Sequence, residues 1–390
     1  MKISLREQLV QFSNVLQAGL FDRLEQELGP LSEKAQRLVS VLAMVSLSRW
    51  ITPRRGWRGR PCRDRQAVGA AFLAKAIYGL ETTRQVLERL QTDRQLRCLC
   101  GWNEVRQIPH ESTFSRAFAE FAGSELPQRL HEALIEATQK DRLVGHIARD
   151  STAIEARERY PENPPPKPQR KRYKMGPKPK RGTPRSPRSR IEAQRSMQVS
   201  DMLAELPRHC SLGVKKSSKG HLNYWRGYKL HLDVADGQIP ITAVLTGACV
   251  HDSQVAVPLM TMTSQRVTYL YELMDAAYDA HAIREHSEAL GHRPITELVR
   301  RHRVTRTKVP PRKDSHAKKT MVTCEPIHRE LTWAEQDRMR ERTMVERVYS
   351  RLKDEFGGRS IRVRGASKIM AHLMFGVLAL TVDQLLRLTG

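Results

Sequence analysis

The chain has 390 residues, of which 67 are Lys or Arg and 42 are Asp or Glu, so its formal charge is +25 at pH 7. This length exceeds what one hydrophobic core usually serves, and the apolar content is ample for two or three structural units. The strong positive charge indicates a polyanionic partner, with DNA or RNA ahead of an anionic membrane surface. The composition therefore indicates a folded nucleic-acid-binding protein with some flexible parts.

The six cysteines are scattered, and none has the C-x-x-C spacing of a zinc site or a redox motif. We therefore expect reduced thiols in a cytoplasmic protein. The first residues, MKISLREQLVQFSNVLQ, have the pattern of an amphipathic helix and lack the apolar core and cleavage site of a signal peptide. The longest apolar stretch, residues 369–388, contains Asp383 and Arg387, which argues against a membrane span. We expect a buried C-terminal helix and no membrane partner.

Residues 1–145 have a helical pattern, because apolar residues repeat at spacings of three and four in segments such as 67–80 and 126–140. Between these segments, residues 108–122 combine a proline, capping residues and three regularly spaced phenylalanines. This pattern is similar to the entry to the second helix of a helix-turn-helix. The phenylalanines have two interpretations, a helix that contacts DNA or plain packing in a core. We expect residues 1–145 to form a helical, DNA-binding N-terminal domain.

The pattern changes at residue 146, where HIARDSTAI begins a strand. Residues 163–190 then hold eleven Lys or Arg, eight Pro and no acid. Such a segment cannot bury enough surface to offset its ordering entropy, so we expect a basic, proline-rich, disordered insertion at about 160–220. It is either a mere linker or a clamp on the phosphate backbone of DNA. A second basic loop is expected at about 301–330.

The residues after 220 predict a sheet flanked by helices. Alternating apolar residues at 228–234 and 239–245 predict two antiparallel strands joined by a turn at Asp236-Gly237. Strands that then alternate with helices predict an α/β fold with a mixed sheet. The further elements expected are a helix at 252–265, a strand at 268–279, a helix to about 290 and a strand at 294–300.

A helix is predicted to begin with the capping box TWAE at 332–335 and to end at Gly357-Gly358. Projected at about 100° per residue, Arg342, Glu346 and Lys353 lie within about 40° of one another, on one border of an apolar stripe. Taken alone, Arg342 and Glu346 predict an i,i+4 ion pair of about 0.2 to 0.5 kcal/mol. The stripe that must face the core consists of Val345, Val348, Tyr349, Leu352 and Phe356.

Two other acids, Asp150 and Asp275, each end an apolar strand-like segment, where a sheet presents side chains to a ligand. With Glu346 on a facing helix, these carboxylates would form a site for two divalent metal ions. Without metal, their repulsion would raise their pKa values, and divalent cations, Arg342 and Lys353 would reverse that effect.

Three further acids are better suited to ordinary structural roles. Asp252 is placed to cap the helix that follows it, Asp279 lies one helical turn after Asp275, and Asp233 belongs to a solvated strand face. We therefore do not expect these three to be metal ligands.

The helix at 332–356 resembles part of the DDE transposases of bacterial insertion sequences, whose catalytic core is ribonuclease H-like. One large group in that family has the signature Tyr, two residues, Arg, three residues, Glu, six residues, Lys. Arg342, Glu346 and Lys353 match that spacing, while Met339 stands at the position of the tyrosine. In the family, that tyrosine would stack on a base or position a phosphate, and no residue of this chain is assigned that role.

Other segments extend the resemblance over about residues 60–390. HIARDSTAIEARE and LMDAAYDA are similar to the segments that carry the family's first and second aspartates, which correspond to Asp150 and Asp275. The resemblance implies three catalytic metal ligands for two Mg²⁺ ions, with Mn²⁺ as a substitute. It also points to four basic side chains that could bind DNA. The catalytic residues would be Asp150, Asp275 and Glu346. Arg342 and Lys353 would bind DNA phosphates, with an ion-pair role as the alternative. Arg362 and Arg364 are further candidates for contact with the DNA backbone, with plain solvated charge as the alternative.

The implied protein is a DNA transposase with a ribonuclease H-like catalytic domain at 146–390, preceded by the helical domain. It would bind double-stranded DNA at the ends of its mobile element and at the target, and catalyse metal-dependent cleavage and strand transfer. A homo-oligomer on DNA, in the bacterial cytoplasm and associated with the nucleoid, is expected by analogy. Two alternatives are a catalytically inactive transposase-derived DNA-binding protein and a ribonuclease H-like nuclease without strand transfer.

Overall fold

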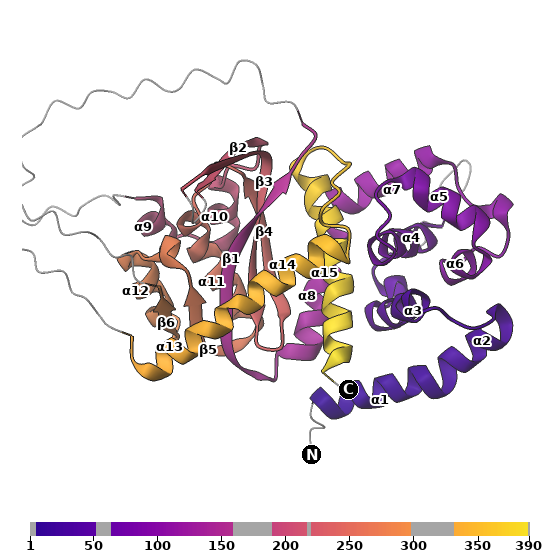
Figure 1. Ribbon diagram of the computed structural model, residues 1–390, viewed down its shortest axis with the longest axis horizontal. Helices are drawn as coiled ribbons and strands as arrows, with labels where there is room; N and C mark the ends of the chain where they lie inside the picture. Colours follow the sequence, from indigo (N-terminus) through magenta and orange to yellow (C-terminus); the bar gives the residue numbers. More distant parts are fainter. Residues whose placement is uncertain (1–4, 52–63, 159–188, 217–219, 298–330, 389–390) are drawn as a thin grey trace, which may run out of the picture.

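The computed structural model describes residues 5–51, 64–158, 189–216, 220–297 and 331–388. N-terminal helices stand on one side and a mixed sheet on the other, with the C-terminal helix α15 (Ala366–Arg387) between them (Figure 1). The expected α/β fold with a helical N-terminal part is confirmed. The basic segments expected at 163–190 and 301–330 lie outside the described residues, except for Ser189 and Arg190.

The N-terminal helices begin at side chains that satisfy free backbone N–H groups. Asp64 accepts hydrogen bonds from the N–H groups of Gln66 and Ala67, and Thr82 forms a capping box with Gln85. The helices are α1 (Leu5–Val15), η1 (Leu16–Phe21), α2 (Asp22–Leu28), α3 (Glu33–Val45), η2 (Leu47–Arg49), α4 (Arg65–Ile77), α5 (Thr83–Thr92), α6 (Arg94–Leu99), η3 (Val105–Gln107), α7 (Glu111–Gly123) and α8 (Leu126–Gln139).

The three phenylalanines of α7 pack into the core. Phe114, Phe118 and Phe121 are buried and lie with their ring centroids 4.8 to 6.3 Å from that of Phe72 on α4. Phe375 of α15 stacks on Phe72 at 5.8 Å and so extends this aromatic cluster to the C-terminal helix. The packing interpretation of the phenylalanines is therefore confirmed, and their face of α7 is not available to DNA.

The sheet has the strand order β2-β3-β1-β5-β6, with β4 paired to β3. β3 runs antiparallel to β1, β2 and β4, whereas β1, β5 and β6 run parallel. The predicted hairpin is confirmed, since Ala235 pairs with Ile239 across a turn in which Gly237 has φ +79°. The strands are β1 (Leu143–Glu155), β2 (Ser211–Lys216), β3 (Leu222–Ala235), β4 (Ile239–Gly247), β5 (Thr268–Met274) and β6 (Arg293–Thr296).

Helices cover both faces of this sheet. Side chains of β1 that point to opposite faces contact different helices. Arg149 binds Asp233, which also accepts a hydrogen bond from Thr263 of α11, whereas Thr152 on the other face accepts a hydrogen bond from α14. One face of β1 is therefore covered by α11 and the other by α14. The helices around the sheet are α9 (Arg190–Gln194), α10 (Val199–Glu205), α11 (Ser253–Arg266), η4 (Ala276–Tyr278), α12 (His281–Ala289), α13 (Trp333–Arg340), η5 (Glu341–Thr343) and α14 (Met344–Asp354).

Part of the expected disordered insertion is folded. The residues from 189 to 216 form α9, α10 and β2, which contradicts the prediction of disorder there. Buried Leu206 explains the difference, because it packs in an apolar cluster with residues of β4 and α11, including Val244 and Leu259. The basic composition of the preceding residues concealed this local apolar content.

Three predicted boundaries also differ. The helix that begins at Thr332 is interrupted by the 3₁₀ turn η5, and α14 ends at Asp354. The strand expected at 268–279 ends at Met274 because Asp275 caps a 3₁₀ turn, and the last strand is only Arg293–Thr296. The apolar stripe of α14 nevertheless faces the core as predicted, since all five of its residues are buried.

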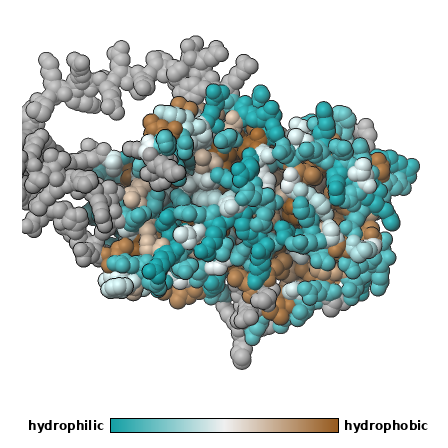
Figure 2. Space-filling model, in the orientation of Figure 1, coloured by the Kyte–Doolittle hydropathy of each residue, from teal (hydrophilic) through white to brown (hydrophobic). Residues whose placement is uncertain are grey.

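α15 is long and apolar enough to cross a membrane by length and composition alone, but 83% of its apolar window is buried inside the protein. It packs against α3, α4, α7, α8 and β4. Gly376 permits close contact, because a Cβ there would lie 2.6 Å from the carbonyl oxygen of Phe356. The expected buried C-terminal helix is confirmed, and the surface in Figure 2 is mainly hydrophilic with small, separate apolar areas.

Candidate active site

Asp150 and Asp275 are neighbours across the parallel pair β1/β5. The last pair in the register joins Arg149 to Met274, so the next position along both chains sets Asp150 beside Asp275. Asp275 keeps an extended backbone (φ −77°, ψ 175°) and so continues the line of β5. Adjacent strands are about 4.8 Å apart. Two carboxylates from segments 125 residues apart in the sequence therefore meet at one edge of the sheet.

Both aspartates have raised pKa values. Burial raises the pKa of Asp150 to about 6, and the charge of Asp275 adds to this shift. Burial also raises the pKa of Asp275, to which the charges of Asp252 and Glu297 contribute. Each aspartate already accepts one backbone hydrogen bond, from Ser151 N at 2.7 Å and from Ala277 N at 3.0 Å. The predicted rise in carboxylate pKa is confirmed for both residues, with burial as its main cause.

Arg342 connects these aspartates with Glu346. Its positive charge lowers the pKa of Asp150 and of Asp275, and its Nη2 lies 3.2 Å from Oε1 of Glu346. The predicted i,i+4 ion pair is therefore present. Because Glu346 remains 55% exposed while Arg342 is only 20% exposed, the pair lies at the border of the core, where the periodicity of the helix had placed it.

The carboxylates suit a divalent cation in part. Their oxygens are ligands that Mg²⁺ prefers, and a dication would stabilise the ionised forms of Asp150 and Asp275, which burial disfavours. Within the described ranges, however, no group of three His, Cys, Asp or Glu side chains is close enough to hold a metal ion. Asp150 and Asp275 thus fit such a site directly, whereas the carboxylate of Glu346 is engaged by Arg342.

Lys353 lies on the same side of β1 as Asp150. Its Nζ donates a hydrogen bond of 2.6 Å to Oγ1 of Thr152, two residues after Asp150 and therefore on the same face of the strand. Burial is the largest cause that lowers the pKa of Lys353, and nearby Arg359 adds to it. The structure therefore places Lys353 on the face of β1 that carries Asp150.

The other two predicted DNA-binding arginines lie elsewhere. Arg362 forms an ion pair of 2.5 Å with Glu81, which lies between α4 and α5, so it is tied to the N-terminal helices. Arg364 is exposed. Met339, at the position of the missing signature tyrosine, is partly buried and packs against the main hydrophobic core.

Two acids near Asp275 have roles that the sequence did not predict. Asp252 precedes α11 without capping it; its carboxylate instead lies 2.9 Å from Nζ of Lys229. Glu297 directly follows β6, and its N–H donates to the carbonyl oxygen of Met274, which places it beside Asp275. The signal for Glu297 was available, because PITE also ends an apolar strand with an acid.

Asp233 contradicts the prediction of a solvated strand face. It is completely buried and binds Arg149, on the face of β1 opposite Asp150. Thr263 of α11 donates a further hydrogen bond of 2.6 Å to its Oδ2. Alternating polar residues in this strand suggested water on one face, but α11 covers that face.

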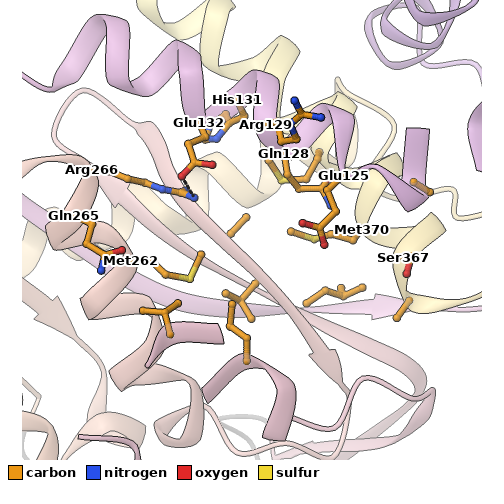
Figure 3. A pocket seen from close by; sticks show the side chains of 18 of the residues that line it. Glu125, Gln128, Arg129, His131, Glu132, Met262, Gln265, Arg266, Ser367 and Met370 are labelled. Carbon is orange, nitrogen blue, oxygen red and sulfur yellow. Dashed lines mark hydrogen bonds and ion pairs between the residues drawn. The ribbon is translucent and has the colours of Figure 1, made fainter. Parts of the chain in front are cut away.

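A separate cavity of about 450 Å³ lies between α8, β4, α11 and α15 (Figure 3). Glu132 and Arg266 form an ion pair of 3.1 Å at its wall, and Met262, Met370 and Met374 supply apolar lining. None of the predicted catalytic or DNA-binding residues lines this cavity. The candidate site is therefore the edge of the sheet beside α14 and not this cavity.

Comparisons with known protein families identify both parts of the chain. Residues 188–382 match the family described as "Transposase DDE domain", and residues 26–120 match "Transposase domain (DUF772)". The first match contains Asp275 and Glu346, while Asp150 precedes it. No curated protein and no solved structure matches the chain. The matches, together with the mixed sheet, show that this chain belongs to the insertion-sequence DDE transposases, with their ribonuclease H-like fold.

Proposed function

We propose that this transposase is catalytically active, cleaves DNA at the ends of its mobile element and joins those ends to target DNA. The observation that carries the proposal is that Asp150 and Asp275 directly follow the last register pair of β1 and β5, close enough for the charge of Asp275 to raise the pKa of Asp150, with both under the positive charge of Arg342. A family of phosphoryl-transfer enzymes supplies the reaction class. Acids that are held close together despite repulsion are typical of a site that binds cations.

Asp150, Asp275 and Glu346 are the proposed ligands of two Mg²⁺ ions, for which Mn²⁺ substitutes. The bound cations would activate a water or a DNA 3′-hydroxyl and neutralise charge on the leaving oxygen. Glu346 must first give up its ion pair with Arg342. That exchange would release Arg342 to bind a DNA phosphate, the kind of group to which a guanidinium donates two hydrogen bonds.

Lys353 is proposed to hold a second phosphate near Asp150, since its ammonium group lies beside Thr152 on the same face of β1. Residues 1–145 are proposed as the domain that recognises the element ends, and the basic segments at 163–190 and 301–330 as contacts to the DNA backbone. We further propose a homo-oligomer that holds two DNA ends, in a bacterial cytoplasm and associated with the nucleoid.

A second candidate function has one observation in its favour. Glu346 is paired with Arg342, and the described residues contain no ready group of three metal ligands. A transposase-derived protein that binds DNA without cutting it would have no need of such a group. A ribonuclease H-like nuclease that cuts without joining is the remaining alternative.

One assay separates these functions. Terminal inverted repeats that flank the gene supply labelled DNA ends, which are incubated with the full chain, Mg²⁺ and a plasmid target. Cleavage with joining supports the transposase, cleavage alone supports the nuclease, and retarded but uncut DNA supports the binding protein. In Asp150→Ala, Asp275→Ala and Glu346→Ala, we expect both reactions to vanish while DNA binding persists. Activity that survives Glu346→Ala would remove this residue from the proposed ligands.

A further inference from the structure

The hydroxyl of Tyr349 contacts backbone groups of two neighbouring strands, β1 and β3. It is 2.6 Å from the carbonyl oxygen of Asp150, 3.0 Å from the N–H nitrogen of Leu232 and 3.1 Å from the carbonyl oxygen of Leu230. The side chain is buried, and burial raises the pKa of Tyr349 well above its usual value, so the hydroxyl keeps its proton. It accepts a hydrogen bond from Leu232 and donates one, with Asp150 as its nearest acceptor.

Asp150 and Leu232 are register partners in the antiparallel pair β1/β3. In an antiparallel pair, partners alternate between those that exchange N–H···O bonds and those that do not, and the β1/β3 register runs through this pair without a shift. The N–H of Leu232 and the carbonyl group of Asp150 also both contact one hydroxyl from a helix. Tyr349 therefore bonds to the backbone of β1 and β3 at the residue that carries the first candidate acid.

The same helix carries the other groups of the site. Glu346 precedes Tyr349 by three residues, about one turn, and Lys353 follows it by four. Apart from Tyr349, the buried side chains of α14 are apolar, and apolar packing is non-directional, so it does not by itself fix how far the helix slides or turns. The hydrogen bond from Lys353 to Thr152 is a second contact with β1, but it comes from the end of a long, flexible side chain. A hydroxyl held by two backbone partners does set that position, because hydrogen bonds weaken steeply with distance and angle.

We propose that Tyr349 is a positioning residue, whose hydroxyl fixes α14 against the backbone of Asp150 and so sets the placement of Glu346 relative to Asp150. This inference rests on the proposed function of both acids. It explains why the helix that carries Glu346 is hydrogen-bonded to the backbone of Asp150. It does not require Tyr349 to touch DNA or metal.

The test compares Tyr349→Phe with Tyr228→Phe in the full chain. Each variant loses one hydroxyl from a buried tyrosine, but the hydroxyl of Tyr228 donates to the carboxylate of Glu158, at 3.0 and 3.1 Å, and not to the backbone of Asp150. Two readouts are taken: the rate of cleavage of labelled element ends, and the Mn²⁺ concentration that produces half of the metal-induced rise in Tm. DNA affinity, measured without metal, serves as a common reference.

For Tyr349→Phe we expect about a 10- to 100-fold loss of cleavage rate and about a tenfold higher Mn²⁺ midpoint, the range typical of groups that orient metal ligands. Tyr228→Phe should stay within about twofold of the wild type in both readouts, and DNA affinity should be unchanged in both variants. If Tyr349→Phe does not fold, 4-aminophenylalanine at position 349 retains the ring and a donor, and it should recover part of the rate.

The outcomes separate this inference from the proposed function. A wild-type chain that cleaves DNA, with a Tyr349→Phe variant equal to Tyr228→Phe in both readouts, would overturn the inference alone. The same holds if the 4-aminophenylalanine variant folds and binds DNA normally but recovers no cleavage. A wild-type chain that neither cleaves DNA nor responds to Mn²⁺ would overturn the proposed function and the inference with it.

Discussion

Arg149 and Asp233 form a completely buried ion pair with two hydrogen bonds, Nε to Oδ1 at 2.8 Å and Nη2 to Oδ2 at 2.7 Å. The two residues are register partners on β1 and β3, and Nη1 of Arg149 also lies 3.5 Å from Oε2 of Glu272 on β5. Burial of Glu272 would raise the pKa of its carboxyl group, but the charge of Arg149 outweighs this effect, and the pKa of Glu272 is about 2. This network joins the three central strands directly behind Asp150.

Removal of one partner should destabilise the protein strongly. Asp233→Ala leaves the guanidinium of Arg149 buried with one carboxylate fewer, which should cost about 3 to 5 kcal/mol in the free energy of unfolding by urea. The double variant Arg149→Met/Asp233→Leu should lose less, because neither charge remains. Asp279→Ala, which breaks a partly exposed pair with Arg284, is the control and should cost less than about 1 kcal/mol. Equal losses for Asp233→Ala and this control would contradict the prediction.

The raised pKa of Asp150 predicts a pH-dependent gain in the variant Asp150→Asn. With a pKa of about 6 in the folded chain and about 3.9 when unfolded, Asp150 binds its proton more tightly when folded. Its contribution to stability is therefore present below pH 4 and lost as the pH rises through 6. Without metal, we expect Asp150→Asn to exceed the wild type by about 2 to 3 kcal/mol at pH 7.5 and by less at pH 4.5.

Urea unfolding in a chelating buffer at the two pH values measures this difference. The exposed Asp201→Asn makes the same change of charge at a surface site and should show no comparable pH dependence. Added Mg²⁺ should favour the wild type over Asp150→Asn, since it binds the ionised carboxylate. A gain for Asp150→Asn that is the same at both pH values would exclude the assigned shift.

Close packing of α15 on the end of α14 predicts opposite effects of two Gly→Ala changes. At Gly376, a Cβ would lie 2.6 Å from the carbonyl oxygen of Phe356 and 3.0 Å from Cδ1 of Leu352, so the helices must separate. Gly376→Ala should therefore cost about 1 to 3 kcal/mol. Gly123→Ala in α7 meets nothing within 4 Å and should be neutral or gain up to about 1 kcal/mol. Thermal unfolding measures the stability of both variants. A Gly376→Ala variant as stable as the wild type would contradict the described packing.

Arg362 has two competing roles, contact with DNA and an ion pair with Glu81. If it binds a phosphate, Arg362→Ala should weaken DNA binding several-fold and reduce the salt slope by about 1. Glu81→Ala keeps the arginine and should not weaken binding. Because both side chains are 42% exposed, the pair itself should contribute little to stability. Equal DNA affinity in Arg362→Ala, Glu81→Ala and the wild type would leave the ion pair as the role of Arg362.

Predictions that depended on neighbouring residues agree well with the structure. The capping box at Thr332, the turn at Gly237 and the apolar stripe that contains Val348 all follow from interactions within a few positions of the chain. Predictions of which side chains are exposed to solvent agreed less well with the structure. Asp233 was expected in water and is buried, because burial depends on whether α11 covers that face.

Periodicity, capping and motif spacing are local properties, so they were enough to predict the type of fold, the helix that bears Glu346 and the two strand-end acids. Which of these groups meet depended on how the whole chain packs. This packing set Asp150 beside Asp275, paired Glu346 with Arg342 and placed the hydroxyl of Tyr349 on the backbone of Asp150. These contacts join segments 125 to 199 residues apart in the first and last cases, and the register that brings such segments together is a property of the whole packed sheet.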